Sequence, residues 1–141
     1  ISVLKSAVDI LQTTRKRSVL TSVYMNLADS YLQKGDYSWC GFYYRRALFV
    51  ADSLGIGYRD YFAIYSGLAK LYLELENFPE ANEYFVKAEQ IDHLCTPYER
   101  YFFSNTRGNY YYNTKEYEKA DSNYDAGFRL CHWDVCAKDC L

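Results

Sequence analysis

The chain has 141 residues, enough for one domain with a sizeable core, and its formal net charge is −2. This charge gives no electrostatic basis for binding nucleic acid or an acidic membrane surface. The sequence contains no run of about 18 apolar residues that could span a bilayer. Its two prolines and seven glycines favour long helices over a turn-rich sheet protein.

The first predicted element, residues 1–13, matches the end of the second helix of a pair, because its AVDIL aligns with the later ALFVA. The segment 17–54 then predicts a full helix pair, since its apolar residues recur at steps of three and four. Between the two helices, Gly35 can end the first in the left-handed conformation and Asp36 can cap the second.

The segment 58–92 predicts a second helix pair. It breaks at ENFPE, where Asn77 is expected to cap the next helix and Pro79 suits its first turn. Glu80, three residues after Asn77, would complete a capping box.

The segment 97–131 predicts a third pair. Thr96 and Glu99 in TPYE form the clearest helix start in the sequence, and Thr114 is expected to cap the second helix of this pair. Residues 134–141 match the opening of a further first helix, so we expect the chain to start and stop in mid-repeat. An intact array would need polar caps at its ends, and none is visible in the sequence.

The three pairs repeat the same residue types with a step of 39–41 residues. Small residues alternate with aromatic ones in each unit, and so many columns in step are not expected by chance. The columns are Ala28/Ala69/Gly108, Tyr31/Tyr72/Tyr111, Tyr37/Phe78/Tyr117, Cys40/Ala81/Ala120, Tyr44/Phe85/Tyr124 and Ala47/Ala88/Gly127.

These columns resemble the tetratricopeptide repeat family, over about residues 17–131. The resemblance implies an all-α fold, a right-handed superhelix of antiparallel helix pairs, with about three full repeats and partial units at both ends. The step exceeds the ~34 residues typical of the family, which longer helices would explain. Long-step arrays of this kind resemble those of bacterial sensor and regulator proteins.

The tyrosines of the columns are interpreted as packing residues, because small partners let the helices approach and the rings fill the space between them. Arg107 departs from the pattern, since Leu27 and Leu68 stand at the equivalent positions. Either its aliphatic stem packs while its head reaches water, or the third unit is shifted or less tightly packed.

In the family the first helix of each pair lines the concave side, so the resemblance implies a peptide-binding face there. In the third repeat Asn105, Asn109 and Asn113 follow at i, i+4 and i+8, and such amides can donate to and accept from a peptide backbone. A plain solvated face that contains asparagine is the alternative. The candidate peptide-binding residues are Met25, Asn26, Asp29, Gln33, Ser66, Lys70, Glu74, Phe102, Asn105, Thr106, Asn109, Tyr112 and Asn113.

The five cysteines are too few and too unevenly spaced for a disulfide framework, so we expect reduced thiols. Near the C-terminus, His132, Cys136 and Cys140 are spaced i, i+4 and i+8 beside Cys131. A straight helix cannot wrap around a tetrahedral metal, so we expect no metal site there. Free thiols favour the cytoplasm, and a periplasmic location stays open if the segment belongs to a membrane-anchored sensor.

Enzyme signatures such as GxSxG, HExxH or a phosphate-cradling glycine loop are absent from the sequence, so we expect no catalytic residues and no cofactor. The prediction is a non-catalytic scaffold that binds a protein or peptide on its concave face, as part of a larger bacterial sensory or regulatory protein. We expect it to contact neither nucleic acid nor a membrane. The alternative is a structural spacer or self-association module, in which uncapped ends pair as a homo-oligomer.

Overall fold

The computed structural model describes residues 1–13, 19–55 and 57–139, without the side chains of Leu11, Thr13 and residues 133–139. Within these ranges the regular structure is helical, and no β-strand occurs. The α-helices are α1 (Ser2–Thr13), α2 (Leu20–Lys34), α3 (Tyr37–Leu54), α4 (Tyr58–Glu74), α5 (Phe78–Glu89), α6 (Pro97–Asn113) and α7 (Tyr117–Asp139).

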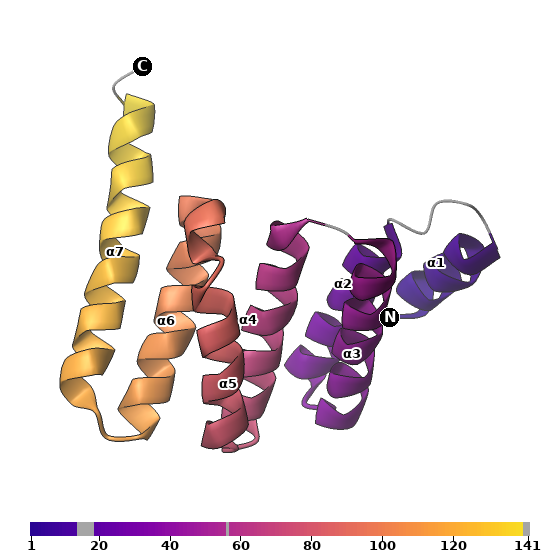
Figure 1. Cartoon of the computed structure of the whole chain (residues 1–141), viewed down its shortest axis with the longest axis horizontal. Coiled ribbons are helices and arrows are strands. Elements are labelled where there is room, and N and C mark those ends of the chain that lie inside the picture. The colour runs from indigo at the N-terminus through magenta and orange to yellow at the C-terminus, as the bar shows by residue number, and fades with distance from the viewer. Residues whose placement is uncertain (14–18, 56, 140–141) are drawn as a thin grey trace.

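The helices lie side by side in a row, with α1 at one end and α7 at the other (Figure 1). Three antiparallel hairpins make up most of the row: α2–α3, α4–α5 and α6–α7, which we call the first, second and third hairpins. The first hairpin packs on the second mainly through contacts between α3 and α4. The second hairpin packs on the third through contacts of α4 and α5 with α6. The predicted all-α solenoid of helix pairs is confirmed.

All three hairpins turn on a residue in the left-handed conformation. Gly35, Glu76 and Lys115 have φ angles of 78°, 55° and 64°, and they keep the 41- and 39-residue steps of the repeat. In each turn the N–H of the following residue donates to the carbonyl oxygen five residues before it, on Tyr31, Tyr72 or Tyr111, over 2.8–2.9 Å. This is the Schellman pattern of helix ends, so one turn geometry is built three times from different residue types.

The predicted caps have mixed outcomes. The carboxylate of Asp36 accepts from the N–H of Trp39, and Thr96 forms a complete capping box with its partner three residues on. Asn77 makes no side-chain cap bond, so the predicted capping box there is wrong. Thr114 ends α6 instead of starting α7, because its hydroxyl points back to the carbonyl oxygens of the last turn of α6.

Helix α7 departs most from the predicted helix ends. In place of the expected turn between residues 131 and 134, it continues to Asp139 (Figure 1). No glycine or proline follows Gly127, so nothing in the local sequence stops the helix. The expected new first helix at residues 134–141 is therefore the end of α7 as far as residue 139, and its last two residues lie outside the described part of the chain.

The core pairs small residues with rings, as the columns predict. Ala28, Ala69 and Gly108 are buried, and a Cβ atom added to Gly108 would meet the ring of Tyr124. Tyr72 is half-buried, with its ring stacked 5.7 Å from that of another tyrosine in the second hairpin. Most rings of the columns thus pack between helices. Tyr117 is an exception to the predicted packing, because it is 54% exposed and its ring lies 5.6 Å from that of the exposed Tyr112.

The third hairpin joins the rest through a small apolar contact and several polar ones. On α6, Phe103 is buried with its ring 5.3 Å from that of Phe62 and 5.8 Å from that of Phe85. Arg107, whose side chain is only 14% exposed, pairs with Glu89 of α5. The guanidinium that replaces a core leucine therefore reaches a carboxylate on the preceding hairpin instead of open water.

Candidate functional site: a cleft along the first helices

The first helices of the three hairpins, α2, α4 and α6, together line a cleft of about 460 Å³. They can do so because α4 contacts both α2 and α6. Seven of the thirteen predicted binding residues line this cleft. They are Met25, Asn26 and Asp29 on α2, Ser66 and Lys70 on α4, and Phe102 and Thr106 on α6.

One end of the cleft is aromatic. Phe62 and Phe103 are buried beneath it, whereas Tyr98 and Phe102 are 66% and 51% exposed, with their ring centroids 4.8 Å apart. Two exposed rings over an apolar floor form a surface onto which an apolar side chain of a partner can pack.

Phe62 and Tyr98 line the cleft but are not among the predicted binding residues, although the sequence contains a signal for both. Tyr98, Phe102 and Thr106 are spaced i, i+4 and i+8, and so are Phe62, Ser66 and Lys70. Residues four apart share one face of a helix, so extending each row by one turn toward the N-terminus would have found both aromatic residues.

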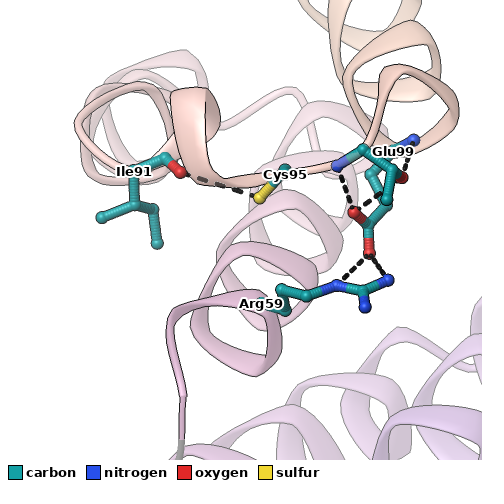
Figure 2. A network of polar contacts seen from close by, with 5 residues as sticks. Arg59, Ile91, Cys95 and Glu99 are labelled. Carbon is teal, nitrogen blue, oxygen red and sulfur yellow. Dashed lines mark hydrogen bonds and ion pairs between the residues drawn. The ribbon is translucent and has the colours of Figure 1, made fainter.

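At this end of the cleft, the carboxylate of Glu99 joins the first turns of α4 and α6 (Figure 2). One oxygen accepts from the guanidinium of Arg59 over 3.0 and 3.3 Å, and the other accepts from the N–H and hydroxyl of Thr96 over 2.8 Å each. Partial burial alone would raise the pKa of Glu99, but these hydrogen bonds outweigh it and hold the pKa below its ordinary value of 4.5.

The other end of the cleft is polar. The hydroxyl of Tyr44 donates to the carboxylate of Asp29, and the Tyr44 ring lies against Gly67 on the neighbouring α4. Lys70 is exposed, and its ammonium has no hydrogen bond or ion pair within the described part of the chain. The cleft therefore presents aromatic rings at one end and an unpaired cation at the other.

The asparagine row does not face the cleft. The side-chain oxygen of Asn105 lies against Gly127 of α7, and that of Asn109 accepts a 2.6 Å hydrogen bond from the hydroxyl of Tyr124. These amides are engaged by α7 because the small and aromatic columns of α7 pack against this face of α6.

The remaining predicted residues lie elsewhere. A second hollow of about 560 Å³, between the ends of α4 and α6, is lined by Glu74, Asn109, Tyr112 and Asn113. Gln33 is exposed and lines neither hollow.

The cysteines differ in burial. Cys40 is fully buried, and this burial, with a smaller contribution from nearby Asp29, raises the pKa of its thiol to about 12. Cys131 is exposed, and both Cys136 and Cys140 lie outside the described side chains. Among the described residues, no three His, Cys, Asp or Glu side chains are grouped to hold a metal ion. None of the helices described is both long and apolar enough to cross a membrane.

Comparison with protein families places a repeat on this chain. Residues 21–48 match the model of the tetratricopeptide repeat. The chain contains a tetratricopeptide repeat. The matched tetratricopeptide repeat covers most of α2 and the first part of α3, so the predicted resemblance is confirmed on the first hairpin. Neither the curated proteins nor the solved structures yielded a match.

Proposed function

We propose that this chain is a non-catalytic scaffold that binds a protein or peptide in the cleft between α2, α4 and α6. Tetratricopeptide repeats generally mediate protein–protein interaction, and the chain contains one. The observation that carries the proposal is the cleft itself, to which all three first helices contribute side chains. We further propose that the array belongs to a larger bacterial sensory or regulatory protein, as its long repeat step suggests.

We divide the array into units at residues 17–54, 58–92 and 97–131, with the end of a preceding unit at residues 1–13. The left-handed turn residue at the middle of each hairpin supports this division. Each unit then contributes its first helix to the cleft, so a ligand would contact three units together.

The aromatic end of the cleft gives the sharpest test. Peptides selected from a random 12-residue library displayed on phage would be measured against the purified chain by fluorescence anisotropy. Replacing Phe102 by Ala removes an exposed ring, so we expect binding to weaken at least about tenfold while the melting temperature stays unchanged.

Phe128→Ala is the matched control, because Phe128 is similarly exposed but lies on α7, away from the residues of the cleft. It should leave the dissociation constant unchanged. Equal loss of binding in both variants, or a failure to select any peptide, would contradict the proposed site.

A second candidate function is self-association. Val3 on α1 and Phe128 on α7 are 79% and 66% exposed, and they lie on the helices at opposite ends of the row. Apolar side chains at both ends could pair chain to chain. Light scattering after size exclusion would give a mass that rises with concentration, and Val3→Asp should abolish that rise.

A further inference from the structure

We infer that the cleft selects a peptide with an internal acidic side chain three to five residues from a large apolar anchor, and that Lys70 recognises the acid. The inference rests on the proposed function, because it names the class of peptide that the same cleft would take. Its basis is the polar end of the cleft. There the column Asp29/Lys70/Asn109, whose members are 41 and 39 residues apart, changes its role in the second hairpin.

In the first and third hairpins the side chain of this column accepts a hydrogen bond from a tyrosine of its own hairpin. Asp29 accepts from the hydroxyl of Tyr44, and Asn109 accepts from that of Tyr124. In both cases the donor tyrosine lies fifteen residues further along, on the second helix of the same hairpin. The polar side chain of the column is thereby held by its own hairpin.

In the second hairpin the column holds Lys70, and the residue fifteen positions further is Phe85. Phenylalanine has no hydroxyl, and Phe85 is completely buried. Lys70 therefore has no internal partner equivalent to those of Asp29 and Asn109, and its exposed ammonium is free to pair with a ligand.

The other two charges that line the cleft are already engaged. Glu99 pairs with Arg59, and Asp29 accepts a hydrogen bond from Tyr44. A carboxylate can form a charge-assisted hydrogen bond with such an unpaired ammonium. A doubly charged phosphate suits the cleft less well, because two of its three charged side chains are themselves carboxylates.

The distance between the two ends sets the spacing of the peptide. Phe62 and Lys70 are eight residues apart on α4, which corresponds to about 12 Å along the helix axis. An extended peptide advances about 3.3 Å per residue, so about four residues separate the apolar anchor from the acid. The acid is an internal side chain, so the preference does not depend on a free carboxyl terminus.

The test uses N-acetylated, C-amidated peptides of twelve residues, each with one Phe in a Gly-Ser background. A second fixed residue, Asp, Ser or Lys, is placed one to eight positions from the Phe. We expect Asp at offsets of three to five to bind about tenfold tighter than Ser, with the difference shrinking at high salt. Lys70→Met should abolish the preference, and Lys70→Glu should transfer it to the Lys peptides.

Lys34→Met provides the control, because Lys34 is an exposed lysine in the last turn of α2 that does not line the cleft. It should retain the full preference for Asp. If the wild-type chain binds Phe peptides equally with Asp and Ser, or prefers Lys because Asp29 reads the ligand, the inference is overturned while the proposed function stands. If no Phe peptide binds, the proposed function itself fails, and the inference with it.

Discussion

At the scale of single residues, the repeat keeps a backbone shape more strictly than a residue type. The turn position holds Gly35, Glu76 and Lys115, and all three are left-handed. Only Gly35 was predicted to be left-handed, because glycine adopts this conformation readily and glutamate or lysine rarely does. A side chain with a Cβ atom is strained there, at a cost of about 1 kcal/mol or more.

Replacing Glu76 by Gly should therefore stabilise the chain. Removing the Cβ atom relieves strain, and the greater freedom of glycine in the unfolded chain offsets part of the gain, leaving about 0.5–1 kcal/mol. Urea denaturation followed by circular dichroism would measure the change. The same substitution at Glu118, an exposed helical residue of α7, should instead destabilise by about 0.5–1 kcal/mol. Loss of stability in both variants would refute the strain argument.

The close approach of α3 and α4 at Gly67 gives a second prediction. A Cβ atom on this residue would fall inside van der Waals contact of the ring of Tyr44, which is buried and hydrogen-bonded to Asp29. Because the ring cannot move aside, Gly67→Ala should cost about 1–3 kcal/mol of unfolding free energy. Gly57→Ala is the control, since no atom lies within 4 Å of its added Cβ, and it should be near neutral. Equal melting temperatures for the two variants would contradict this packing.

At the scale of elements, most helix limits were predictable because local chemistry marks them. TPYE gave the start of α6 at Pro97, and the KGD turn gave the end of α2 within one residue. The end of α7 was not predictable from the repeat alone, because the alignment demanded a turn where the sequence holds no helix breaker. The direction of the asparagine row was missed for another reason: which face of α6 meets α7 is decided by tertiary packing.

The start of α6 should show a specific pH dependence. The pKa of Glu99 lies below 4.5 in the folded chain, so its carboxylate stabilises the fold at neutral pH. This contribution is lost as the pH falls from the unfolded value through the lower folded one. We therefore expect Glu99→Gln to be less stable than wild type at pH 7 and to converge with it once the pH falls below the folded pKa. Urea titrations at several pH values would measure this, and a constant difference across the range would count against it.

At the scale of the whole molecule, the solenoid is a row of contacts between neighbouring hairpins, and the buried ring of Phe103 is central to the contact between the second and third. The fold class and the repeat were accessible from sequence because the small and aromatic columns recur along the chain. Only part of the cleft could be predicted from the sequence, since the position of its aromatic end depends on how α4 and α6 pack side by side.

Phe103→Ala should loosen the third hairpin selectively. Removing a buried ring costs about 3–5 kcal/mol, and the loss falls on one contact in a chain of nearest-neighbour contacts. Hydrogen–deuterium exchange should accelerate in α6 and α7 while α2 and α3 stay protected. Phe128→Ala, which removes an exposed ring, should leave the exchange pattern unchanged. Uniform acceleration across all helices would mean that the array unfolds as one cooperative unit.

The placement of the cleft gives the array a mechanical property. Because α4 lies between α2 and α6, a peptide that contacts all three helices would link the first and third hairpins, which otherwise pack on each other through the second. A bound peptide would then raise the bending stiffness of the solenoid. An empty array would yield at a lower pulling force than a filled one, and the difference would be transmitted to whatever is attached at either end.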